Sequence, residues 1–524
     1  MLKTLFKSTV SPFRLLSFLG FWFFTSVLYR DMFYMAEQHS LFVFDRQVMR
    51  FILDQPLGEL LCLGRFLLLS FHEPWLGGFF MSMILTATVY LQKYIFSLQG
   101  KWEWLSLLPS VGVMGYLVHK GLNLYYQQEP SVVFLLPVLL LFLSGVIAIL
   151  KRCFASGDKR QTVSTSMLSV GISIVLFASL YAYAWNGKEN ERLTATSQRM
   201  FQQQDWQGMI ETTRKAKQPT RSIAAYHAIG LLHTNQLLTR LFEIPYQYPD
   251  LGLSNRGGQS DDGTDLYLAD CCFAAGLLYP AYHHTMERMV VDGPSCYTLK
   301  QLFFCSLLNE EYALANKYLY ILMQVPTEKK FVYKYMPLVA NREQIMANPY
   351  FSKVVELSPM KDHFEQEYRS PFFIGYNVQM TNARNLQAID VSLAACLYAK
   401  MLPEMFNRTR PYAGKQLPPL VEQAVVLYSL QRSGTGGNDI LNYFQVNPQT
   451  VSRVKEFVGR YVSNGTVGPS KYEMLQEEYK NFYPCYFYCQ NKVNEAEMSK
   501  YKSLMRGGRE LMESKKAYTG KALY

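Results

Sequence analysis

The chain has 524 residues, with 52 Lys and Arg against 41 Asp and Glu, a formal net charge of +11. Hydrophobic residues make up 49% and charged residues 18%, whereas soluble domains carry about 25% charged residues. This composition excludes a disordered chain, a coiled-coil rod and a collagen-like chain. Neither half carries a long basic run, so we expect no nucleic-acid partner.

Apolar stretches cluster in residues 1–186, which we interpret as a transmembrane domain in a lipid bilayer. A bilayer core of about 30 Å needs about 20 helical residues, and about five stretches approach that length. No small-residue cleavage site follows the first stretch, so we read it as a span and not as a signal peptide. The predicted spans lie near residues 13–30, 74–93, 103–119, 131–151 and 163–185.

Residues 58–71 are apolar but contain Arg65, and they run into Pro74. Together with the span that follows, they are too long for one helix across a bilayer. Proline removes a helix hydrogen bond and clashes one turn back. The sequence therefore predicts an interfacial or re-entrant helix over 58–71, a break at Pro74 and then the span.

The loop charges predict the orientation. With the N-terminus in the cytoplasm, nine Lys and Arg residues fall in inner segments and five in outer segments, as the positive-inside rule requires. The strongest indication is Lys151-Arg152 and Lys159-Arg160 between the last two spans. Five spans then place the remaining chain outside the cytoplasm.

Residues 187–490 predict an extracytoplasmic helical domain, because apolar residues recur at spacings of three and four. Segments such as 295–308 with 310–324 read as helix pairs, and Asn447-Pro448 reads as a helix start. Tyr312–Leu319 with Pro326 resembles the second helix of a tetratricopeptide repeat. An irregular helical domain is the alternative. Residues 491–524 predict a charged C-terminal helix or tail, and the fold class is all-α.

Nine cysteines are present, seven of them in the second half. Most fall on apolar helical faces, where cysteine behaves as a small buried hydrophobe. An exported domain could also oxidise them. We expect buried free thiols, with a structural disulfide or metal as the alternative.

Other chemical motifs are weak. His283 and Glu287 share a helical face but lack a second ligand cluster. The acidic 261–265 lacks the remaining ligands of a calcium loop, and the glycine-rich 433–437 lacks the Lys-Ser/Thr ending of a phosphate loop. We therefore expect no cofactor and no metal.

The most suggestive residues lie at the predicted outer membrane face, and the candidates are Glu37, Arg65, His72 and Glu73. Ionisable residues near membrane depth are costly and often mark function. His72 beside Glu73 could act as an acid/base pair, and Arg65 could hold a phosphate or carboxylate. The structural alternative is that these side chains reach the interface and pair with one another.

Five short segments carry a family resemblance: Phe33-Tyr34-Met35-Ala36-Glu37-Gln38, Leu41-Phe42, Pro56-Leu57-Gly58, Leu63-Gly64-Arg65-Phe66-Leu67 and Pro74-Trp75-Leu76-Gly77. Together they resemble the N-terminal signature of an uncharacterised family of bacterial polytopic inner-membrane proteins. Leu57 replaces the first glycine of that family's Pro-Gly-Gly turn. The resemblance implies a protein of a bacterial inner (plasma) membrane whose helical domain is exported to the periplasm, and it implies no activity.

The leading functional hypothesis is a cell-envelope scaffold or binding protein that presents a helical domain to an envelope protein partner. The alternative is a membrane-embedded enzyme or carrier that acts on a lipid-linked or glycan substrate through the four candidate residues. A transporter is a third hypothesis.

Overall fold

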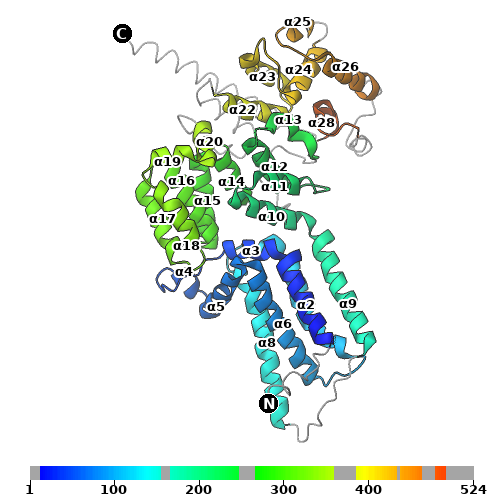
Figure 1. Cartoon of the computed structure of the whole chain (residues 1–524), viewed down its shortest axis with the longest axis vertical. Helices are drawn as coiled ribbons and strands as arrows, with labels where there is room; N and C mark the ends of the chain where they lie inside the picture. Colours follow the sequence, from blue (N-terminus) through cyan, green and yellow to red (C-terminus); the bar gives the residue numbers. More distant parts are fainter. Residues whose placement is uncertain are drawn as a thin grey trace, which may run out of the picture.

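The computed structural model describes residues 12–154, 166–246, 266–358, 385–432, 437–462 and 478–490. Within these ranges the chain is helical with connecting turns and contains no β-strand, so the all-α prediction is confirmed. Long helices lie side by side in one half, and shorter helices form the other half (Figure 1). The predicted tail 491–524 and the motifs at 261–265 and 433–436 lie outside the described residues.

The first half consists of a bundle of long apolar helices and several short ones. Its helices are α2 Pro12–Phe23, α3 Arg30–Gln38, α4 Arg50–Leu53, α5 Gly58–Leu68, α6 Pro74–Ile95, α7 Leu108–Lys120, α8 Glu129–Phe154 and α9 Met167–Ala182.

Among the described residues, three helical segments are long and apolar enough to cross a membrane: Pro74–Ile95, Glu129–Phe154 and Met167–Gly187. A fourth candidate is the pair Pro12–Leu28 and Arg30–Gln38, which bends by 65° at Tyr29. The prediction of about five spans is therefore higher than these criteria support.

The difference lies in the predicted span near 103–119. This segment forms a short 3₁₀ helix, Glu103–Leu107, followed by the 13-residue α7. At 1.5 Å per residue α7 is about 20 Å long, shorter than the hydrocarbon core. The 3₁₀ segment before it and the turn at Gly121 after it limit the α-helix to that length.

Close backbone approaches hold the bundle together. A Cβ atom at Gly64 of α5 would lie 2.5 Å from the carbonyl oxygen of Ser131 on α8, which is far inside contact distance. α5 ends in the 3₁₀ helix Leu69–His72, and Pro74 starts α6. The break therefore falls where proline chemistry predicts it. The interfacial position of α5 stays a prediction.

The second half consists of helices of 4 to 15 residues, many packed as neighbours along the chain (Figure 1). They are α10 Glu189–Gln203, α11 Trp206–Thr213, α12 Arg221–His233, α13 Leu237–Arg240, α14 Leu266–Ala274, α15 Leu278–Asp292, α16 Cys296–Leu308, α17 Tyr312–Gln324, α18 Lys329–Tyr335, α19 Arg342–Ala347, α20 Pro349–Leu357, α22 Leu386–Tyr398, α23 Leu402–Arg408, α24 Pro419–Gln431, α25 Gly437–Leu441, α26 Pro448–Phe457 and α28 Tyr483–Cys489.

Local chemistry explains several of these helix starts. The Ser295 side chain accepts from the Thr298 amide, and the Thr298 side chain accepts from the Ser295 amide, so the two residues form a capping box. Asn447 caps α26 ahead of Pro448, as the sequence predicts. The predicted pair 295–308 and 310–324 is confirmed as α16 and α17.

The two halves share a hydrophobic core. Leu41, Val43 and Ile52 of the first half pack in one buried cluster with Phe303 and Leu319 of the second. The amide of Cys296 donates to the carbonyl of Ser40 at 3.0 Å. Part of the core of the helical half therefore comes from the segment that follows α3.

All nine cysteines are thiols outside any disulfide, and eight are buried, while Cys153 is exposed. The prediction of buried free thiols is confirmed for those eight. None of the nine forms a disulfide.

Candidate functional site

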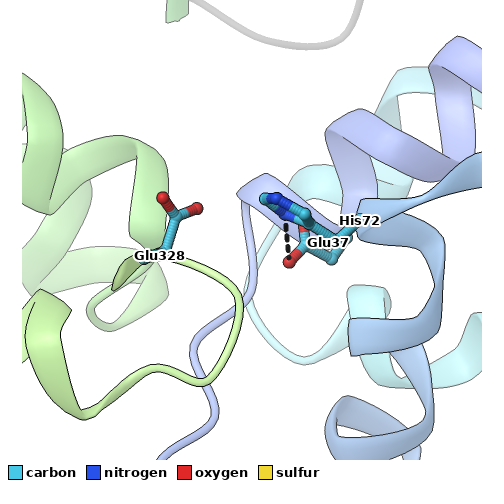
Figure 2. Close-up of side chains that lie close together, drawn as sticks. All are labelled: Glu37, His72 and Glu328. Carbon is cyan, nitrogen blue, oxygen red and sulfur yellow. Dashed lines mark ion pairs between the residues drawn. The ribbon is translucent and has the colours of Figure 1, made fainter. Parts of the chain in front are cut away.

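The structure brings two of the four predicted site residues together and leaves two elsewhere. Glu37 and His72 face each other, with 3.5 Å between Glu37 Oε1 and His72 Nδ1 (Figure 2). Glu73, which the sequence pairs with His72, is exposed at the start of α6. The imidazole therefore lies beside a different carboxylate from the one that the sequence suggested.

Arg65 is buried away from this pair, with 1% of its surface exposed. Its Nη2 donates to the carbonyl of Gln127 at 3.0 Å, and its guanidinium lies over the ring of Phe51. Burial lowers the Arg65 pKa to about 10. Because the side chain is enclosed, Arg65 ties α5 to the start of α8 and does not present itself to a phosphate or carboxylate.

Four further polar residues complete what we call the junction cluster, which consists of Glu37, Gln38, His72, Lys300, Thr327 and Glu328. Glu37 and Gln38 end α3, and His72 ends the 3₁₀ helix before α6. Lys300 comes from α16, and Thr327 and Glu328 come from the turn between α17 and α18. The cluster is thus built from both halves of the protein.

Gln38 is the bridge of the cluster. Its Nε2 donates to Glu37 Oε2 at 2.7 Å and to Glu328 Oε1 at 3.0 Å. Its Oε1 accepts from Lys300 Nζ at 2.7 Å. The side chain is fully buried, so all three bonds form away from solvent.

The other contacts satisfy the remaining charges. Lys300 Nζ lies 2.7 Å from Glu328 Oε1. The Thr327 hydroxyl donates to Glu37 Oε1 at 3.2 Å. Glu37 and Glu328 are 1% and 2% exposed, whereas the His72 side chain is 27% exposed. Solvent therefore reaches the cluster from the His72 side.

Electrostatics keep the buried groups charged. Burial would raise the pKa of Glu328, but the Lys300 ammonium and the Gln38 amide outweigh it and hold that pKa below its usual value. Burial would lower the pKa of Lys300, but Glu328 raises it overall. The pKa of His72 shifts in the same direction as that of Lys300. Burial lowers the His72 pKa, but the neighbouring Glu37 carboxylate raises it by more, so the net shift is upward.

Glu37, His72 and Glu328 also have the composition of a metal site. Each offers one ligand atom, and these atoms lie within 4.8 Å of one another. In the part of the chain that the structure describes, no other group of three His, Cys, Asp or Glu meets that criterion. His283 and Glu287, the pair that the sequence suggested, are 3.0 Å apart on α15, and His284 Nδ1 lies 3.7 Å from Glu287, but in the described ranges these residues do not form a group that meets the criterion.

Fold and site together define a helical protein with several potential membrane spans and a buried polar cluster at the junction of its two halves. The chain belongs to a family of unknown function, DUF6057, whose model matches residues 5–144 and 116–490. No curated protein and no solved structure matches the chain. The comparisons therefore establish the family and leave the function to be argued from the structure.

Proposed function

We propose that the protein is a multi-pass protein of a bacterial inner membrane that presents its helical half outside the cytoplasm as a scaffold for envelope proteins. The observation that carries this proposal is the junction cluster. Six buried or half-buried polar side chains from both halves contact one another, and they lie beside a shared apolar core. Such a junction fixes the helical half in one orientation, as a presenting platform requires.

Contacts at the two ends of the bundle support the proposed topology. At one end Lys93 of α6 pairs with Glu103 before α7, and Lys151 of α8 binds the carbonyl of Tyr94. At the other end Lys120 of α7 pairs with Glu129 of α8. α7 thus runs between the same two ends as α6 and α8. Counting α7 as a fifth passage places the helical half opposite the N-terminus, with the cytoplasm assigned by the positive-inside rule.

The neighbouring helices of the second half support the scaffold role. Pairs such as α10 with α11 and α16 with α17 are adjacent along the chain and in space. Stacked helix pairs of the tetratricopeptide type bury a continuous core and expose a long surface for partners. Under this proposal that surface binds another envelope protein.

The test is crosslinking in intact cells, followed by purification in mild detergent and mass analysis. We expect a stoichiometric envelope protein whose crosslinks map to residues 187–490. Crosslinks that map only to residues 1–186, or a co-purified lipid with no protein partner, would contradict the proposal. Deleting the helical half is a poor test, because it would expose Leu41, Val43 and Ile52.

A membrane enzyme or carrier for a lipid-linked substrate is the second candidate, and one observation favours it. Glu37 and His72 form a partly exposed carboxylate–imidazole pair next to a predicted membrane face, an arrangement suited to acid–base catalysis. Complementation of a deletion strain separates the two candidates. A catalytic pair predicts that Glu37→Gln and His72→Asn each abolish function at normal protein level, whereas a scaffold tolerates both when folded.

A further inference from the structure

We infer that Glu37, His72 and Glu328 form a binding site for a divalent transition-metal ion that joins the two halves of the protein. This inference goes beyond the scaffold proposal and does not depend on it. The ligands come from three separate elements: α3, the end of the 3₁₀ helix before α6, and the turn before α18. An ion held there would connect the first half to the second through direct bonds.

The first argument is the distance between His72 and Glu37. At 3.5 Å, the separation of Nδ1 and Oε1 is long for a hydrogen bond, and His72 Nδ1 is buried without a hydrogen-bond partner among the described residues. Ligands about 2.0–2.1 Å from a tetrahedral zinc ion lie about 3.3 Å from each other. The two atoms are thus spaced as two ligands of one ion.

The second argument is the state of the carboxylates. Both bonds to Glu328, from Lys300 and from Gln38, use Oε1, so Oε2 is the atom left for an ion. Gln38 likewise binds Oε2 of Glu37, while Oε1 faces His72 and accepts one hydrogen bond, from Thr327 at 3.2 Å. Side chains that bind the ligands in this way are typical of the shell around a metal site, where they fix ligand orientation.

The charges are compatible with a divalent ion. Two carboxylates and the Lys300 ammonium sum to one negative charge when His72 is neutral. A divalent ion turns that sum into one positive charge, so occupation does not increase the size of the buried charge. Three protein ligands leave room for water as a fourth, and the exposed side of His72 gives solvent a path.

The ligand atoms define the class of metal. One imidazole nitrogen and two carboxylate oxygens suit zinc, manganese or iron. Magnesium and calcium prefer sites made of oxygen alone. We therefore expect Zn²⁺ to bind and Mg²⁺ not to compete at equal concentration.

The experiment uses the full chain in detergent, purified without a polyhistidine tag and stripped with a chelator. Zn²⁺ is added back, its content is measured by mass spectrometry of the metal, and its affinity is measured against a chromophoric chelator. We expect one Zn²⁺ per chain. His72→Asn and Glu37→Gln should each weaken binding at least about tenfold, while His283→Asn, which removes the exposed imidazole beside Glu287, should leave it unchanged.

X-ray absorption at the zinc edge supplies an independent readout. The site predicts a shell of nitrogen and oxygen at about 2.0–2.1 Å and no sulfur at about 2.3 Å. Less than stoichiometric zinc, a sulfur ligand, or unchanged affinity in both variants would each overturn the inference. Because His72 is partly exposed, His72→Asn decides the matter if Glu37→Gln does not fold. Envelope-partner crosslinking is scored separately, so either proposal can fail alone.

Discussion

Replacing Gln38 with methionine tests whether the junction cluster holds the two halves together. The substitution keeps the size and flexibility of the side chain but removes its donor and its acceptor. Glu37, Glu328 and Lys300 would each lose one hydrogen bond to a buried amide. Bonds to charged groups contribute about 1.5–3 kcal/mol each, so three of them set an upper limit of about 5–9 kcal/mol.

We expect a smaller loss, about 3 kcal/mol in the free energy of unfolding, because the charges keep other partners. Glu328 retains Lys300, and Glu37 retains Thr327. Denaturant titration in detergent micelles measures the loss, and hydrogen exchange locates it. Exchange should rise at the end of α3 and in the turn before α18 and stay unchanged in α24, a buried helix of the distal core.

The matched control is Gln207→Met, which removes an exposed amide bonded to Glu211 on α11. Surface substitutions of this kind change stability by less than about 0.5 kcal/mol. If Gln38→Met costs no more than this control, the cluster does not stabilise the junction and the reasoning fails.

Three further predictions concern a buried carboxyl group, a close helix contact and the thiols. Asp270 is fully buried and accepts from the Tyr226 hydroxyl at 2.6 Å, and burial raises its pKa from 3.8 to about 7. The folded state therefore holds this proton more tightly, so stability is full below about pH 4, falls by up to about 4 kcal/mol as pH rises to 7, and then levels off. Denaturant titrations between pH 4 and 8 should show this fall in the free energy of unfolding as pH rises, and Asp270→Asn should lack that contribution. An equal dependence on pH in both proteins would refute the assignment. Gly64→Ala places a Cβ 2.5 Å from the Ser131 carbonyl and should lower the free energy of unfolding by about 1–3 kcal/mol. The control Gly112→Ala places a Cβ with no atom within 4 Å and should not lower it. Equal changes in the melting temperature of the two variants would contradict that packing. Native protein in detergent should react with maleimide at Cys153 alone. In intact cells a membrane-impermeant maleimide should leave Cys153 unlabelled, because the proposed topology places it in the cytoplasm. Labelling of Cys153 from outside the cell would contradict that topology.

Local patterns in the sequence predicted the local structure well. The helix pair of α16 and α17, the start of α26 and the break at Pro74 all follow from caps, proline and apolar spacing, which act over a few residues. The number of membrane spans was harder to predict from the sequence. It depends on where a helix bends, as at Tyr29, and on how short a packed helix can be, as α7 shows.

Sequence analysis singled out some residues of the candidate site and missed others. Glu37 and His72 stood out because ionisable residues are rare near membrane depth. Gln38 lies in the same predicted outer loop as Glu37 but was not one of the four candidates. Lys300 and Glu328 carried no local signal, since they lie 262 and 290 residues from Gln38 and look like ordinary surface charges in the sequence.

Arg65 shows a feature that the sequence did not reveal. Its type and position suggested a residue that could hold a phosphate or carboxylate at the outer membrane face. The structure encloses it between Phe51 and the start of α8. Packing decides between these outcomes, and packing is not visible in the spacing of residues along one segment.

The shared core has a consequence for biosynthesis. Leu41, Val43 and Ile52 leave the ribosome long before the helices that cover them, and Gln38 precedes its partner Lys300 by 262 residues. At about 5–20 residues per second, that interval lasts roughly 13–50 s. During that interval the apolar edge of the first half is uncovered. The nascent protein should therefore depend on a chaperone at the membrane surface, and a stalled or truncated chain should be a substrate for quality-control proteolysis.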